Sequence, residues 1–171
     1  MLTRLGLSSL LVVSLVTSAL GHVTLEQPEA SVGGSYKAVF RVPHGCGTSA
    51  TLKVRVRIPE GVVQIKAMPK AGWTIETIRG TYGKSYAVYH GSVSEGVKEV
   101  TWTGRLLDEN YDEFVLSVFL TDALVPGSNL YFPVVQECES GTNRWIEVPT
   151  EGKTGADYKE PAPRLKLLPK K

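Results

Sequence analysis

Thr51-Leu52-Lys53-Val54-Arg55-Val56-Arg57-Ile58 is the stretch that decides the fold, because apolar and basic side chains alternate along it without interruption. Side chains of a β-strand point alternately to its two faces, so Leu52, Val54, Val56 and Ile58 would share one face and the three basic side chains the other. This pattern predicts an antiparallel strand with one face in a core and the other in water.

Outward from this strand, the chain continues as short alternating segments separated by glycine and proline, and no long apolar repeat has helical spacing. We expect further strands at Tyr36–Val42, Trp73–Arg79, Ser85–Tyr89, Val97–Thr103, Glu113–Leu120, Leu130–Gln136 and Arg144–Val148, broken apart by Pro43, Pro59, Gly61, Gly72, Gly80 and Gly104. Such a series predicts an all-β fold, a single antiparallel two-sheet sandwich of immunoglobulin-like or cupredoxin-like type.

The first 21 residues have the features of a signal peptide: a basic start at Arg4, the apolar run Leu10–Val16, and the small-residue end Ala19-Leu20-Gly21. Cleavage after Gly21 would leave one β-sandwich domain over residues 22–171, in the periplasm or secreted. Its proline- and lysine-rich end, residues 152–171, offers Leu165–Leu168 as a last strand. No second long apolar stretch follows, so we expect no transmembrane anchor in the mature chain; the alternative is an uncleaved N-terminal anchor.

Composition and motifs exclude several functions. Of 171 residues, 19 are Lys or Arg and 17 are Asp or Glu, scattered along the chain, which argues against a nucleic-acid partner. Neither a G-x-S-x-G nor an H-E-x-x-H motif occurs. An acidic group could bind calcium or supply a carboxylate pair, but we favour a solvated turn before a strand because its spacing matches no calcium loop: Asp108, Glu109, Asp112 and Glu113.

Two cysteines, Cys46 and Cys138, remain in the exported part of the chain. An oxidising compartment favours a disulfide for an even pair, and we predict that the two are bridged. The alternative is a thiolate metal site, which these isolated cysteines suit poorly because they lack the close spacing of a zinc or iron–sulfur motif.

His22 would become the first residue of the exported protein. Its α-amino group and its ring Nδ1 can then chelate one ion, and a set of nitrogen donors favours copper(II) over other divalent metals. This arrangement is a histidine brace, and it requires that no residue precede the histidine. The alternative is a frayed terminus that merely carries a histidine.

An ordered set of motifs now gives a resemblance that covers nearly the whole of the chain after Gly21. The motifs are His22-Val23-Thr24-Leu25 to Pro28, Gly34-Ser35-Tyr36, Arg41-Val42-Pro43-His44-Gly45-Cys46, Met68 to Trp73, Tyr111 to Phe114, and Phe132 to Cys138 and on to Trp145. In these the chain resembles the YcnI-like family of exported copper-binding domains. The resemblance implies a β-sandwich that holds copper through its N-terminal histidine, His22, with a tryptophan, Trp145, beside the metal, in copper homeostasis.

Some members of that family supply a glutamate ligand from the loop after the second strand, whereas Pro43-His44-Gly45-Cys46 contains none. We predict that His44 takes its place, because a disulfide at Cys46 would fix the loop. The alternative is a surface histidine in a turn. Glu137 or Glu139 could orient His44, and His90 is a further, minor ligand candidate.

Trp145 could equally belong to the core, as we expect of Trp73 and Trp102. It lies just after Cys138, so the predicted disulfide would draw its strand towards the His44 loop.

The resulting hypothesis is a non-catalytic protein that holds one copper(II) ion and exchanges it with a membrane copper transporter or another copper chaperone. A first alternative is an oxidative enzyme resembling the polysaccharide monooxygenases, which also use an N-terminal histidine. A second is an extracytoplasmic interaction domain without metal.

Overall fold

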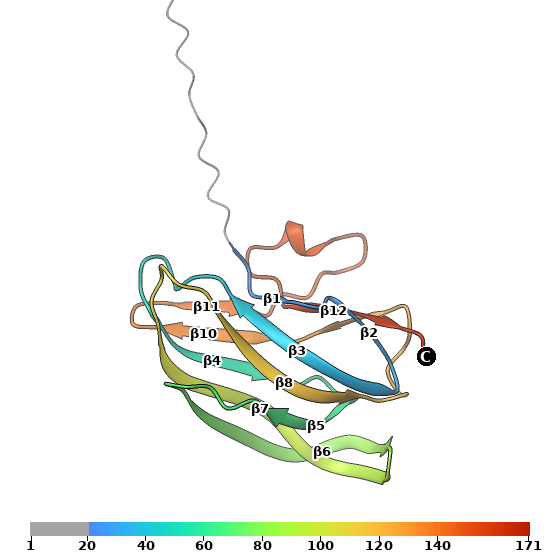
Figure 1. Ribbon diagram of the computed structural model, residues 1–171. Helices are drawn as coiled ribbons and strands as arrows, with labels where there is room; N and C mark the ends of the chain where they lie inside the picture. The colour runs from blue at the N-terminus through green and yellow to red at the C-terminus, as the bar shows by residue number, and fades with distance from the viewer. Residues whose placement is uncertain (1–20) are drawn as a thin grey trace, which may run out of the picture.

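A computed structural model describes residues 21–171, so the predicted signal peptide lies outside the described residues except for Gly21. The alternating segment forms β4 (Thr51–Arg57), the central strand of a five-stranded antiparallel sheet with the order β11-β10-β4-β7-β6 (Figure 1). Val54 and Val56 are fully buried, as their alternation predicts. The other strands of this sheet are β6 (Thr74–Val88), β7 (Gly91–Leu106), β10 (Val134–Cys138) and β11 (Thr142–Trp145).

A second antiparallel sheet, with the order β1-β3-β8-β5, covers the inner face of the first. Its strands are β1 (Thr24–Leu25), β3 (Gly34–Val42), β5 (Val62–Ala67) and β8 (Asp112–Leu120). The core between the sheets includes Phe40, Phe114 and Trp102, all without exposed surface. Two packed antiparallel sheets confirm the predicted all-β sandwich.

A small three-stranded sheet closes one side of the sandwich, and it consists of β2 (Glu29–Ser31), β12 (Arg164–Leu168) and β9 (Asn129–Tyr131). Leu165 and Leu167 of β12 are buried in the main core, so the C-terminal end supplies a strand, as predicted. A loop over residues 146–161, which contains the short 3₁₀ helix η1 (Gly155–Asp157), precedes β12.

Two predicted strand breaks are wrong, because β6 runs through Gly80 and β7 runs through Gly104. At Gly104 the ring of Trp73 lies where a Cβ would stand, so this glycine permits a close contact rather than a turn. The predicted strands Trp73–Arg79 and Ser85–Tyr89 are therefore parts of one long strand. Conversely, Phe132 and Pro133 divide the predicted Leu130–Gln136 into β9 and β10, which belong to different sheets.

The distal half of the β6–β7 hairpin packs over the outer face of the four-stranded sheet. There Tyr82 and Tyr86 contact Val63 of β5 and Phe119 of β8 in a second, smaller apolar cluster. Within residues 21–171, no helix is long and apolar enough to span a membrane.

Candidate functional site

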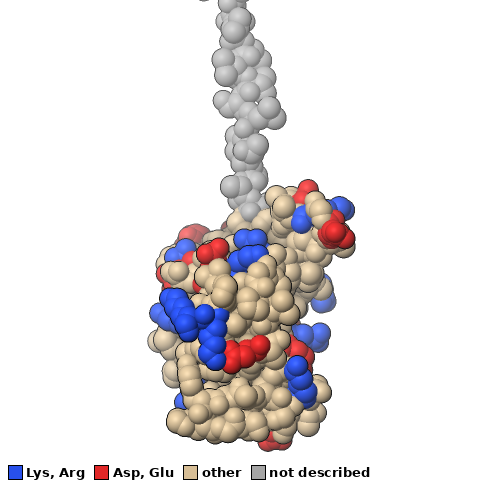
Figure 2. All heavy atoms as spheres, turned by 90° about the vertical axis from the view of Figure 1, so that its right-hand side faces the viewer, with Lys and Arg blue, Asp and Glu red and all other residues tan. Residues whose placement is uncertain are grey.

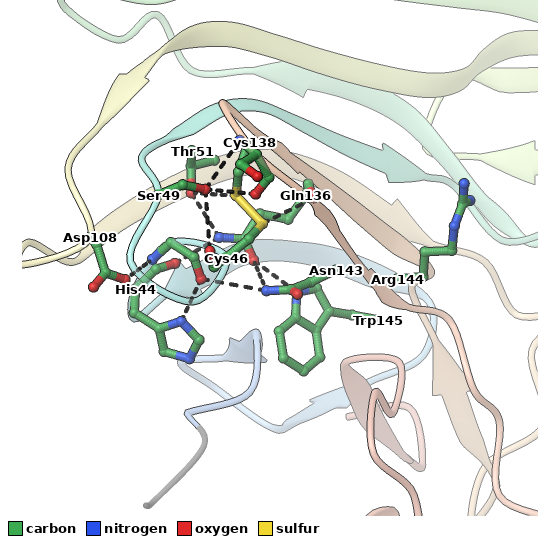
Figure 3. Close-up of a disulfide and its surroundings, with 12 residues drawn as sticks. His44, Cys46, Ser49, Thr51, Asp108, Gln136, Cys138, Asn143, Arg144 and Trp145 are labelled. Carbon is green, nitrogen blue, oxygen red and sulfur yellow. Dashed lines mark hydrogen bonds between the residues drawn. A yellow bond between two sulfur atoms is a disulfide. The ribbon is translucent and has the colours of Figure 1, made fainter.

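The loop from Pro43 to Ala50 crosses from β3 in one sheet to β4 in the other, and it carries His44. Cys46 and Ser49 hydrogen-bond each other's backbone in both directions, at 3.1 and 3.2 Å. The carboxylate of Asp108 accepts a hydrogen bond from the Gly45 amide at 2.9 Å. The predicted disulfide is present between Cys46 and Cys138, with Cα atoms 5.9 Å apart. Backbone, side-chain and covalent contacts thus fix the loop that presents His44 (Figure 3).

Gln136 connects this loop to Trp145 from a position without exposed surface. Its amide group donates to the carbonyl of His44 at 2.6 Å and to the hydroxyl of Thr51 at 2.7 Å. Its carbonyl oxygen accepts a hydrogen bond from the indole Nε1 of Trp145 at 3.0 Å. Because the buried amide of Gln136 makes hydrogen bonds to all of these groups, it orients both the loop and the indole.

The N-terminal segment reaches the same place because β1 pairs with the end of β3, with Thr24 opposite Arg41. Val23 is buried at 1% exposure, which anchors the residue next to His22. The rings of His22 and Trp145 have centroids 5.5 Å apart. Figure 3 shows the ring of His44 and the indole of Trp145 both pointing towards this segment.

The ring of His44 contacts two carbonyl oxygens, with Nδ1 2.6 Å from Gly45 O and Nε2 2.7 Å from Gly21 O. A neutral imidazole has only one N–H, so it can donate to only one of them. Donation from Nδ1 to the Gly45 carbonyl leaves a lone pair on Nε2, aimed at the junction between Gly21 and His22. A histidine held by its other nitrogen in this way is typical of metal ligands.

The structure therefore brings His22, His44 and Trp145 together. His22 and His44 are partly exposed. Trp145 is only 4% exposed and belongs to the main core, as its alternative interpretation predicts, and its ring also lies near His22. No group of three or more His, Cys, Asp or Glu side chains in residues 21–171 is placed to hold a metal, but a terminal amine is not among those groups.

His90 lies apart from this cluster, exposed in the turn between β6 and β7. The β6 edge is opposite to the β11 edge that carries Trp145. The prediction that Glu137 or Glu139 orients His44 is wrong, because Glu137 pairs with Arg55 and Glu139 with Arg105. The carbonyl of Gly45 takes that place instead.

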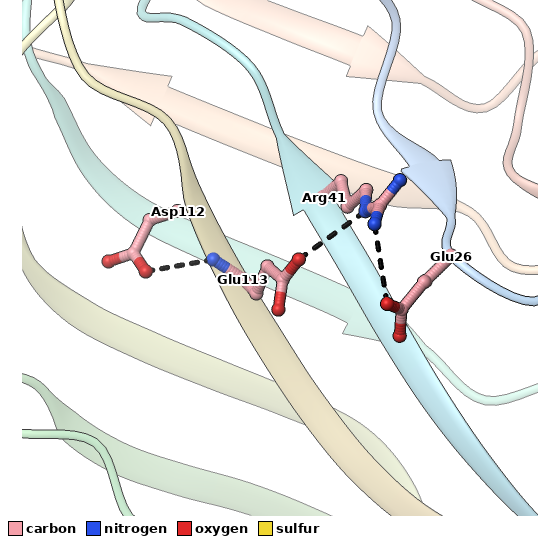
Figure 4. Close-up of polar contacts among 4 residues, drawn as sticks. All are labelled: Glu26, Arg41, Asp112 and Glu113. Carbon is pink, nitrogen blue, oxygen red and sulfur yellow. Dashed lines mark hydrogen bonds and ion pairs between the residues drawn. The ribbon is translucent and has the colours of Figure 1, made fainter.

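Three of the four side chains of the acidic group make structural contacts. Asp108 holds the His44 loop, Asp112 pairs with Lys70 at 2.5 Å, and Glu113 contacts Arg41 at 3.3 Å. Arg41 also reaches Glu26 at 3.3 Å and so ties β3 to both of its neighbouring segments (Figure 4). These contacts favour the turn interpretation of the group over calcium or a catalytic pair.

Sequence reasoning missed Gln136 and its neighbour Asn143, whose amide lies 3.4 Å from the Gln136 carbonyl oxygen. The signal was present in the alternation of β10, where Gln136 takes the same face as the buried Val134. A polar side chain at an inward position must find buried partners, and this marks it as part of a network.

Sheet order and packing define the protein as an immunoglobulin-like β-sandwich, with the candidate histidine site at one end. The chain belongs to a family described as a domain of unknown function, DUF1775, whose model matches residues 22–167. It is similar to an uncharacterized protein from Nocardia farcinica whose crystal structure has an immunoglobulin-like fold. The two are 27% identical, with a TM-score of 0.63, over 86% of this chain and 98% of that chain. No curated protein matches the sequence.

Proposed function

We propose that the protein is an exported, non-catalytic copper-binding protein of the YcnI-like type, which holds one copper(II) ion on His22 after cleavage at Gly21. The ligands would be the α-amino nitrogen and Nδ1 of His22 and Nε2 of His44, with Trp145 beside the ion. Three nitrogen donors are a set that copper(II) prefers. The match to the family model begins at His22, which supports this residue as the start of the domain.

The observation that carries the proposal is the 2.7 Å contact between His44 Nε2 and the carbonyl oxygen of Gly21. That oxygen and the His22 nitrogen are bonded to the same carbon, so His44 Nε2 lies within about 5 Å of the future terminal amine. Cleavage would remove the carbonyl that Nε2 contacts and leave its lone pair free. It would create the amine in the same step.

The proposed transfer of copper to another protein requires that the metal ligands be accessible. His22 and His44 are partly exposed, so a bound ion could be transferred by ligand exchange to a membrane copper transporter or another copper chaperone. Trp145 shields one side of the site and, through cation–π attraction, would favour a cation beside it. Export places the protein in the periplasm or outside the cell.

The test compares copper(II) titrations and electron paramagnetic resonance spectra of protein that begins at His22 with protein that carries one extra glycine before it. Mass spectrometry confirms each N-terminus. We expect the extra residue to abolish tight binding and to change the nitrogen hyperfine pattern. His44→Ala should weaken copper binding in the His22 form, while His90→Ala, the matched control, should not.

Equal binding by both forms would refute the brace, and the domain would then be an interaction module without this metal site. Oxidised oligosaccharides formed in the presence of copper and a reductant would instead indicate the monooxygenase-like alternative.

A further inference from the structure

A cavity of about 650 Å³ lies between β1, the β9–β12 pair and the 146–161 loop. This volume is in the range of small-molecule sites. His22 lines one edge of the cavity, but neither His44 nor Trp145 does. The cavity thus lies beside the proposed copper site and shares only His22 with it.

The 146–161 loop forms a fixed wall of this cavity. At its base, the Glu147 amide donates to the Glu160 carbonyl at 3.1 Å, and the Ala162 amide donates to the Glu147 carbonyl at 2.8 Å. Near its tip, Thr154 donates to the carboxylate of Asp157 from its backbone and its hydroxyl, at 2.7 and 3.0 Å. Figure 2 shows the loop as a lobe that stands out from the body. These hydrogen bonds fix the loop at its base and near its tip, so the cavity is already formed in the absence of a ligand.

Two cations line the cavity, and no carboxylate does. Arg164 of β12 is directly opposite Tyr131 of β9 in the antiparallel register, so both side chains project from the same face of the small sheet. Lys153 reaches the cavity from the loop, where its ammonium lies 5.7 Å from the ring centroid of Tyr158. Neither Lys153 nor Arg164 takes part in an ion pair with any residue of the described chain, 21–171.

The rest of the lining is mainly apolar, with side chains that cannot donate a hydrogen bond. These residues come from the N-terminal segment and from both ends of the loop: Val23, Leu25, Pro28, Pro149, Pro161, Ala162 and Pro163. A site of this kind suits a ligand with an apolar body and one anionic group that the guanidinium can bind through two parallel hydrogen bonds.

We propose that this cavity binds a small organic acid, with its carboxylate on Arg164 and Tyr131, its charge further compensated by Lys153, and its apolar body against the prolines. Binding of the acid requires no metal, so this proposal can be tested independently of the proposed copper site.

The experiment is a titration of the metal-free protein with phenylpropionate, followed by amide resonances in nuclear magnetic resonance spectra and by calorimetry. We expect saturable shifts at Tyr131, Arg164 and the 146–161 loop. The uncharged amide of the same acid should not bind. Inorganic phosphate should bind more weakly than the acid, because it cannot use the apolar walls.

Arg164→Gln should weaken phenylpropionate binding by about tenfold or more, since it removes a charge-assisted hydrogen bond. Lys166→Gln is the matched control, because Lys166 lies two residues further along the same face of β12, outside the cavity. It should change the affinity by less than about threefold, because the Lys166 ammonium hydrogen-bonds the Gly127 carbonyl and neither residue lines the cavity. Unchanged resonances outside the cavity will show that each variant is folded.

Three outcomes would overturn the proposal. They are the absence of saturable shifts at the cavity residues, equal binding of the acid and its amide, and equal weakening by the two substitutions.

Discussion

At the scale of single residues, the candidate site depends on one buried amide. Gln136 satisfies the carbonyl of His44 and the indole N–H of Trp145 at the same time, so the position of two proposed functional side chains follows from one that no metal would touch. Buried polar networks of this kind stabilise a unique arrangement only while every member has a partner.

We therefore predict that Gln136→Leu, a substitution of similar size, lowers the free energy of unfolding by about 2–5 kcal/mol, because it leaves buried hydrogen-bonding groups without a partner. Denaturant unfolding followed by tryptophan fluorescence measures this directly. The exposed Gln27→Leu serves as the control and should change stability by less than about 0.5 kcal/mol. An unchanged unfolding midpoint for Gln136→Leu would show that the network does not stabilise the fold.

Residue by residue, the sequence predicted the disulfide and the convergence of His22, His44 and Trp145. It did not predict which group orients His44, because that group is the backbone carbonyl of the next residue, Gly45. Every residue has a backbone carbonyl, so side-chain patterns cannot indicate which one acts as the acceptor. Glu137 and Glu139 looked suitable only by their closeness to Cys138. Glu137 instead pairs with Arg55, and Glu139 pairs with Arg105.

At the scale of elements, hydrophobic alternation located most strands but not their connections. It predicted β4 and β8 well, because one face of each is buried against the opposite sheet. It did not identify β5, in which a register shift between Val63 and Lys66 interrupts the alternation. Glycines were interpreted as breaks, although two of those predicted as breaks lie inside strands.

The β6–β7 hairpin gives a direct test of what its glycines do. Gly80 and Gly96 are opposite each other in the register, yet their surroundings differ. The ring of Tyr82 occupies the space that a Cβ on Gly96 would need, whereas a Cβ on Gly80 would meet only the Lys98 side chain, at 3.4 Å.

We predict that Gly96→Ala lowers the free energy of unfolding by about 1–3 kcal/mol through overpacking against Tyr82. Gly80→Ala, its partner across the hairpin, should stay within about 0.5 kcal/mol of the unmodified protein. Thermal and denaturant unfolding of the two variants side by side provide the measurement. Equal effects would mean that the strand backbone, and not the Tyr82 contact, determines the cost.

At the scale of the whole molecule, a disulfide fixes the loop that connects the two sheets at the end that carries the candidate site. The His44 loop leaves β3 of one sheet and enters β4 of the other, and the disulfide fastens it to the end of β10. The same bond therefore fastens the loop to the five-stranded sheet and holds His44 beside the N-terminal segment. Stability and the proposed copper affinity should depend on it together.

Replacing both cysteines, as Cys46→Ala with Cys138→Ala, should lower the free energy of unfolding by about 2–4 kcal/mol, because the bond closes a loop with a sequence separation of 92 residues. The variant should still fold, since the core between the sheets contains neither cysteine and the Gln136 bond to the His44 carbonyl remains. Copper titration of the folded variant should then give an affinity between that of the unmodified protein and that of His44→Ala, because a loosened loop orders at a cost when its imidazole binds. If the variant loses stability but binds copper with unchanged affinity, the hydrogen bonds of Gln136 and Asp108 to the loop are enough to position His44, and the disulfide contributes only to the stability of the fold.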